Sequence, residues 1–217
     1  MRCVDGGGGC AYAAGVRCSY GRRPLQRIAR GGIALAMAAI AAGSMGCAEL
    51  PANVPRAEGF DARQLSGGWH VLASNFPMWL EGNKSEPNFI YRVLPGEEPV
   101  RLDDIVAYTE SGRRETIEGT DTQDPQSPAH FTWRGKGLLA AFSSDWVVVA
   151  RGPEDRWLVL YFTKTLATPE GVDVIARTPE LSPEDRESVE KLLANHSFLK
   201  EKSKGILWLG RARPVGR

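Results

Sequence analysis

Between residues 68 and 177 the chain is a series of short apolar-rich runs, and this pattern constrains the fold more than any other feature. Connections of hairpin length, rich in glycine, proline and polar residues, separate the runs. Eight strands at nearly regular spacing are typical of an antiparallel barrel or sandwich. The runs cover residues 68–74, 88–94, 101–110, 114–120, 129–142, 145–151, 156–163 and 171–177. Gly135 and Gly137 fall within the fifth run and predict a bulge or bend in one long strand.

One helix is predicted after the eighth run. Ser182 is a typical N-cap residue, Pro183 suits the first helical position, and two acidic residues follow in the first turn. Apolar residues recur at helical spacing between 189 and 193. A short ninth strand is expected at residues 206–209, after a basic linker.

An aromatic and a basic residue stand at the two ends of the strand series. Trp69 follows a glycine turn at the start of the first run, and Arg177 ends the eighth run. An arginine over an indole face contributes about 0.5–2 kcal/mol. Their order, spacing and intervening strands resemble the lipocalins, in which such a pair closes one end of the barrel. The resemblance covers about residues 60 to 209 and is strongest with bacterial lipocalin lipoproteins.

This resemblance implies an all-β fold: an eight-stranded antiparallel up-and-down barrel, one C-terminal α-helix packed outside it and a short ninth strand. It assigns Trp69 and Arg177 to structural closure of the barrel. A second family motif, T-D-x-x-Y, is only partly present, as Asp155 and Trp157 in the loop before the seventh run. They are assigned to the same closure, and the departure from the motif indicates a distant member.

The N-terminal segment resembles an export signal of lipoprotein type. Four arginines between residues 22 and 30 precede an uncharged run of small apolar residues, 31–45, which is too short to span a membrane comfortably. The run ends at Cys47, where a preceding glycine resembles the bacterial lipobox. Cys47 is therefore the expected lipid attachment site, although Ser44 stands where the family prefers leucine; a plain signal peptide with an incidental cysteine is the alternative. The first 20 residues are unusually long for an n-region and suggest an over-extended start.

The chain is thus expected to have four parts: a signal segment (1–46), a flexible tether (47–59), the barrel (60–210) and a tail (211–217). Removal of residues 1–46 changes the net charge from +1 to negative, which argues against a nucleic-acid partner. The removed part contains three of the 4 cysteines, so the barrel has no internal disulfide or thiolate site. The expected location is the bacterial cell envelope, on the outer membrane facing the periplasm if the cell is Gram-negative. Protein partners are not indicated.

Few residues suggest catalysis. The 3 histidines do not stand at metal-ligand spacing, and His130 is interpreted as a surface or barrel-wall residue. Carboxylate pairs such as Asp103-Asp104 and Glu154-Asp155 lie in turns or strand starts, where solvation explains them. No nucleophile motif or phosphate loop is present. We therefore expect no metal, no cofactor and no enzymatic activity.

The strands instead carry many aromatic residues, and an eight-stranded barrel can hold one small ligand. Alternation along the second run places Phe89, Tyr91 and Val93 inside the barrel. The same argument gives this list of expected ligand-binding residues: Val71, Phe89, Tyr91, Val93, Tyr108, Trp133, Trp146 and Tyr161. Filling of the barrel explains them equally well. Residues 76–79 (Phe-Pro-Met-Trp) are expected to be exposed at the barrel mouth, as a lid or a membrane contact.

The leading hypothesis is a membrane-tethered lipocalin that binds a fatty acid, lysophospholipid or similar apolar molecule for storage or transport. Arg92, Arg114 and Arg134 are candidates for holding the ligand's head group. An isomerase or de-epoxidase on a lipocalin-like barrel, and a structural envelope protein with a filled barrel, remain alternatives.

Overall fold

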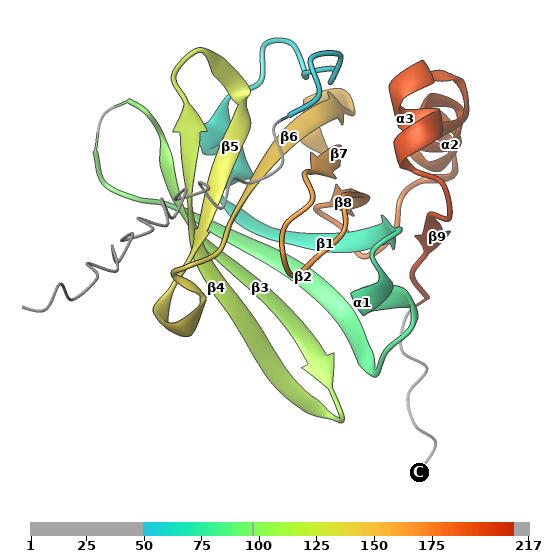
Figure 1. The fold of residues 1–217 in the computed structure, drawn as a ribbon. Coiled ribbons are helices and arrows are strands. Elements are labelled where there is room, and N and C mark those ends of the chain that lie inside the picture. Colours follow the sequence, from blue (N-terminus) through green and yellow to red (C-terminus); the bar gives the residue numbers. More distant parts are fainter. Residues whose placement is uncertain (1–49, 97, 211–217) are drawn as a thin grey trace, which may run out of the picture. The chain divides into compact units, whose positions relative to one another are not determined.

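Eight antiparallel strands close into a barrel (Figure 1). Strand β1 (Gly67–Ser74) pairs with both β2 (Lys84–Val93) and β8 (Gly171–Ala176), which closes the barrel. The strands between them pair in chain order: β3 (Arg101–Glu110), β4 (Arg113–Asp124), β5 (Ser127–Gly135), β6 (Ser143–Arg151) and β7 (Trp157–Phe162). The predicted fold class is confirmed. This computed structural model describes residues 50–96 and 98–210. The predicted signal segment, Cys47 and the tail lie outside that range.

Two helices and a ninth strand follow the barrel. Helix α2 (Pro183–Asn195) begins as predicted, because the Ser182 hydroxyl accepts a hydrogen bond from the Asp185 amide at 3.1 Å. A single helix was expected, but His196 adopts an extended conformation and starts the shorter α3 (Ser197–Lys202). Strand β9 (Leu207–Trp208) pairs with β1 outside the closed barrel. Of the helices in the described ranges, none combines the length and apolar character needed to cross a membrane.

The apolar side chains form two separate layers. Along β7, Leu158 and Leu160 belong to the inner cluster, while Trp157, Val159 and Tyr161 belong to an outer cluster shared with α2 and α3. Figure 1 shows the two helices together outside the barrel, in orange and red. A strand covered on both faces is apolar at every position, so its sequence does not reveal which residues face inward.

Two predicted segments differ from the structure. The expected tether is packed on the barrel over its described part, with Val54 buried in the outer cluster and the Ala57 amide donating to the Val148 carbonyl at 2.8 Å. The expected long fifth strand ends at Gly135, and a 3₁₀ turn, η2 (Gly137–Leu139), follows it. A side chain at Gly135 would collide with Leu139, and Gly137 has φ of 57°, so the glycines mark the end of the strand instead of a bulge.

The loop between β1 and β2 folds over one end of the barrel. It contains the short helix α1 (Pro77–Leu80), whose Trp79 ring lies 5.7 Å from the ring of Tyr108. Phe76 meets Phe162 of β7 at 5.6 Å between ring centroids. Phe76 and Trp79 are buried, which corrects the expectation of an exposed apolar lid. They instead cover one end of the barrel interior and, together with Tyr108, form its roof.

Candidate functional site

A cavity of about 300 Å³ lies inside the barrel beneath this roof. Its walls are mostly aromatic and aliphatic and come from strands β2 to β8 and from the loops at the open end. The apolar lining residues are Phe76, Met78, Trp79, Phe89, Val106, Ile117, Trp133, Leu139, Phe142, Trp146, Phe162 and Ala167. A volume of this size is at the lower end of the range of small-molecule pockets, about 300–1,000 Å³.

Three of the predicted ligand-binding residues line this cavity: Phe89, Trp133 and Trp146. Tyr91 and Val71 belong to the inner cluster but not to the cavity wall. The Tyr91 ring stacks on Trp146 with centroids 6.0 Å apart, so it supports the wall from behind. These five residues face inward as the strand alternation predicted, while a role in ligand binding stays a prediction.

The remaining three expected residues lie elsewhere. Tyr108 packs under Trp79 in the roof, and Val93 is 38% exposed at the end of its strand. Tyr161 faces outward, with its ring 5.0 Å from Phe198 of α3 and its hydroxyl donating to Glu170 at 2.7 Å. The inward assignment of Tyr161 is therefore wrong by one position, and Phe162 takes its place in the cavity wall.

Two buried carboxyl groups also face the cavity, and sequence reasoning missed both. Asp104 on β3 is 6% exposed and Asp173 on β8 is 1% exposed. Strand alternation puts both side chains inside the barrel. Asp104 lies between Leu102 and Val106, which face inward, and Asp173 lies two residues before Ile175, which also faces inward. In each of these two carboxyl groups, the oxygen Oδ1 has no hydrogen-bond partner. A bound molecule would meet these carboxyl groups together with the lining hydroxyl residues Ser143, Ser144, Thr165 and Thr168.

Neighbouring residues hold both carboxyls in place. Gly119 lies opposite Asp104 on β4, and because a side chain there would collide with Trp133, the glycine lets the indole lie flat across the strand. The Trp133 side chain forms a hydrogen bond with Asp104. Ser74 lies opposite Asp173 on β1 and forms a hydrogen bond with it.

Burial changes the acidity of these groups. It raises the pKa of Asp173 from 3.8 to about 7. It also raises the pKa of Asp104 well above its usual range, and the nearby Asp121 and Asp103 add to that rise. Near neutral pH the cavity therefore contains carboxyl groups that can be protonated or charged according to what lies beside them.

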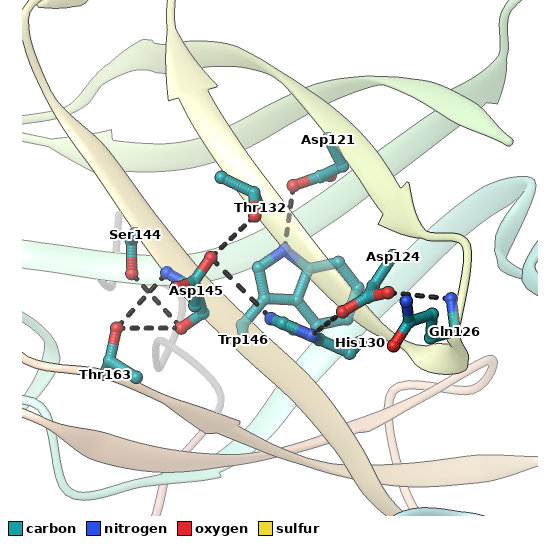
Figure 2. A network of polar contacts seen from close by, with 9 residues as sticks. All are labelled: Asp121, Asp124, Gln126, His130, Thr132, Ser144, Asp145, Trp146 and Thr163. Atoms are coloured by element: carbon teal, nitrogen blue, oxygen red, sulfur yellow. Dashed lines mark hydrogen bonds and ion pairs between the residues drawn. The ribbon is translucent and has the colours of Figure 1, made fainter. Parts of the chain in front are cut away.

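A third acid, Asp121, lies deeper in the barrel. Its Oδ1 accepts a hydrogen bond from the Trp146 indole at 2.8 Å (Figure 2). Burial raises its pKa to about 7, although the indole bond opposes this. Asp121 does not line the cavity; it fixes the indole that does.

The three candidate head-group arginines do not reach the cavity. Arg92, Arg114 and Arg134 are exposed, and none lines it. Arg92 lies 3.9 Å from Asp103 on the outer face, and Arg114 contacts the Glu86 carbonyl at 3.3 Å. The cavity lining contains carboxyl groups but no lysine, arginine or histidine.

A polar network on the outer wall surrounds His130 (Figure 2). Its Nδ1 lies 2.9 Å from an oxygen of Asp124, and its Nε2 lies 3.7 Å from Asp145 on β6. Thr132 donates to the same Asp145 carboxylate at 2.6 Å. Asp145 and Asp124 raise the pKa of the His130 imidazole, against the effect of its partial burial. These contacts connect β5 to β6 on the outer face of the barrel, which agrees with the interpretation of His130 as a barrel-wall residue. Across residues 50–96 and 98–210, no three histidine, cysteine or acidic side chains are grouped so as to hold a metal ion.

The closed end has the predicted cation–π pair. The Arg177 guanidinium lies 3.7 Å from the centre of the Trp69 ring, and it donates to the carbonyls of Gly68 and Gln64. The Trp69 indole donates to the Leu65 carbonyl at 2.8 Å. The predicted contact is confirmed.

The two other residues assigned to closure differ from each other. Asp155 is buried near this end and pairs with Arg151 at 3.1 Å. Trp157 lies on the outer face, where its indole donates to Asp185 of α2 at 3.1 Å. Trp157 therefore attaches the helix to the barrel and does not close it.

Comparison with known proteins supports the fold. No protein-family model matches the chain. No curated protein matches it in sequence. Among solved structures, lobster apocrustacyanin A1 is similar, with a TM-score of 0.52, 13% identity, and coverage of 70% of this chain and 80% of that chain. Crustacyanin is a lipocalin, so the chain has a lipocalin-like fold.

Proposed function

We propose that this chain is a lipoprotein of the bacterial cell envelope whose barrel binds a small apolar molecule. The observation that carries the binding proposal is the aromatic-lined cavity of about 300 Å³. Removing apolar surface from water contributes about 25 cal/mol per Å², so an apolar molecule gains from entering such a space. A barrel that was simply filled by its own side chains would not leave this room.

The open end offers a route for such a molecule. Leu138 of η2 and Leu166 of the β7–β8 loop are 101% and 81% exposed. Each is next in sequence to residues that line the cavity, Leu139 and Ala167. The rim of the mouth is thus apolar, as entry from a lipid phase would require.

Fatty acids and lysophospholipids fit this site in one orientation. Their tails suit the aromatic walls, but an anionic head would meet Asp104 and Asp173 if it entered first. The head therefore stays at the mouth, where the exposed Lys164 adjoins the lining residue Thr165.

The anchoring proposal rests on the basic segment, the apolar run and Cys47. Leu50 already packs against the outer cluster of the barrel. Only two residues separate Cys47 from that contact, so acyl chains on Cys47 would hold the barrel close to the membrane surface. Several such chains give firm attachment, at about 0.8 kcal/mol per buried CH₂.

Native mass spectrometry of the full chain tests the binding proposal. Purified from membranes in mild detergent, the protein should carry a small apolar molecule in addition to its own mass. Val106→Trp adds bulk at the cavity wall and should lose this molecule, whereas Leu207→Trp, at an exposed site on β9, should keep it. Circular dichroism checks both folds, since overpacking costs about 1–3 kcal/mol. If folded wild type carries no bound molecule, or if folded Val106→Trp carries as much of it as wild type does, a filled, structural barrel is favoured.

Acid catalysis is a second candidate function, and the buried carboxyls favour it. A carboxyl with a pKa of about 7, such as Asp173, suits a general acid near neutral pH. It would protonate a carbonyl or epoxide oxygen of an apolar substrate, in an isomerase or de-epoxidase type of reaction. Asp173→Asn should then abolish turnover of that substrate and leave its binding intact. Turnover unchanged in this variant would remove the candidate.

A further inference from the structure

Two carboxyl groups approach the cavity from different walls of the barrel. Asp104 comes from β3 and Asp173 from β8, and two other strands, β1 and β2, lie between them in the sheet order. Each has an unpartnered Oδ1, and each is more than nine-tenths buried. An unpartnered buried oxygen destabilises the folded protein, and more so when it is charged. The protein thus carries two groups that a bound molecule would satisfy.

Of the three other buried acids in the described ranges, two have cationic partners and the third, Asp121, accepts a hydrogen bond from the Trp146 indole instead. Asp155 has Arg151 at 3.1 Å, and Asp185 has Arg156 at 3.2 Å. Within the described ranges, no lysine, arginine or histidine forms an ion pair with Asp104 or Asp173, and none lines the cavity. Asp104 and Asp173 therefore face the space for a ligand without the positive charge that accompanies Asp155 and Asp185.

The aromatic walls favour a cation in the same place. Trp133 and Trp146 line the cavity beside the acids, together with Phe89 and Phe162. An ammonium group within about 6 Å of an aromatic ring is attracted to the ring face, most strongly at tryptophan and when water is excluded. A carboxylate or phosphate group would find no cationic partner in the cavity lining and would be disfavoured by the negative faces of the rings.

We propose that the cavity takes a small arylalkyl or alkyl amine whose ammonium group is held by the carboxyl groups that face the cavity, Asp104 and Asp173, and whose apolar part lies against the aromatic walls. This inference rests on the proposed binding function and names its ligand class. A volume of about 300 Å³ limits the ligand to one or two rings. An organic cation fits better than a metal ion, because within the described part of the chain no three ligating side chains converge.

Ammonium binding also accounts for the protonation state of the site. A positive charge within about 4–6 Å of a carboxyl favours its ionised form. The amine would therefore convert the two acids from neutral groups into counterions as it binds. Without an amine, protonation near neutral pH keeps the charge out of the apolar interior.

Three matched probes test the proposal: 2-phenylethylamine (a cation), 2-phenylethanol (neutral) and 3-phenylpropanoate (an anion). The full chain is reconstituted in phosphatidylcholine nanodiscs, and binding is measured by calorimetry at pH 7.5 against protein-free discs. The amine should bind at least tenfold tighter than the alcohol, and the anion should bind more weakly than both.

Asparagine substitutions locate the cation. Asp104→Asn and Asp173→Asn should each weaken amine binding at least tenfold and leave alcohol binding within about twofold. Glu115→Gln is the matched control, because Glu115 is an exposed carboxylate on the neighbouring strand β4 and does not line the cavity. This variant should change amine binding by less than twofold.

The outcomes separate the two proposals. If the alcohol binds as tightly as the amine, the cavity is functional but the cation inference is overturned. If the amine binds best but the two asparagine variants bind it as well as wild type, the assignment to Asp104 and Asp173 is overturned. If none of the probes binds to folded protein, the proposed binding function fails as well.

Discussion

Replacing Asp173 with asparagine should change how the stability of the ligand-free protein depends on pH. The carboxyl is 1% exposed, and its burial raises the pKa from 3.8 to about 7. In the unfolded chain an aspartate has a pKa of about 3.9. Between pH 4 and pH 7 the folded state therefore keeps a proton that the unfolded state releases. The free energy of unfolding consequently falls as pH rises through this window.

The size of the effect follows from the shift. Each pKa unit is equivalent to about 1.36 kcal/mol, so a rise of about three units removes about 4 kcal/mol of stability between pH 4 and pH 8. Asparagine is neutral, has nearly the same shape and can still accept a hydrogen bond from Ser74. Asp173→Asn should therefore be close to wild type at pH 4 and more stable by about 4 kcal/mol at pH 8. Asp121 titrates in the same window, but it is present in both proteins and cancels in the difference.

Urea unfolding of the full chain, followed by circular dichroism at intervals from pH 4.5 to pH 8.5, measures this difference. Glu115→Gln, at an exposed position on β4, is the control and should stay parallel to wild type. A difference between Asp173→Asn and wild type that stays constant within about 1 kcal/mol would refute the reasoning, since the folded protein would then hold Asp173 at its ordinary acidity.

Three other changes have expected outcomes. Cys47→Ala should move the protein out of the membrane fraction, as cell fractionation and blotting would show; a variant that stays membrane-bound and uncleaved would indicate an uncleaved anchor. Trp69→Ala should destabilise the barrel by about 3–5 kcal/mol and Arg177→Ala by less, and a double-mutant cycle should show non-additivity, because the two side chains touch at 3.7 Å. His130→Gln should lower stability by up to about 1 kcal/mol at pH 6. Because the folded His130 pKa is raised by Asp145 and Asp124, that gap should shrink in urea titrations as pH rises above about 6.5, and a gap that widens instead would contradict this sign.

The fold could be predicted because its signals are local. Turn residues separate the runs, Ser182 caps the helix, and the third run has the same bounds in the sequence pattern and in β3. The pairing of Trp69 with Arg177 followed from the ends of the strand series. The facing of Tyr161 could not be predicted this way, because β7 is apolar on both faces. Helices α2 and α3 pack against the outer face of β7. The six apolar residues of this strand do not indicate which of its two faces the helices cover.

The inward position of Asp104 could have been predicted from the sequence, but interpreting Asp103 and Asp104 together as a solvated pair misses it. Along β3 the residues Leu102, Val106 and Tyr108 share one face, and Asp104 lies between them on that face. Period-two alternation therefore places Asp103 outside and Asp104 inside, although the two are adjacent in sequence.

Such an inward acid does not help the barrel to fold. Removing a buried carboxyl from water raises the free energy of the folded state unless a partner compensates. Arg151 pairs with Asp155 and Arg156 with Asp185, whereas Asp121 has the Trp146 indole as its partner. A barrel that needed only to be filled would be more stable with apolar residues at positions 104 and 173. Their carboxyls, facing a cavity from two different strands, are therefore better explained by the molecule that the cavity binds or acts on than by the stability of the fold.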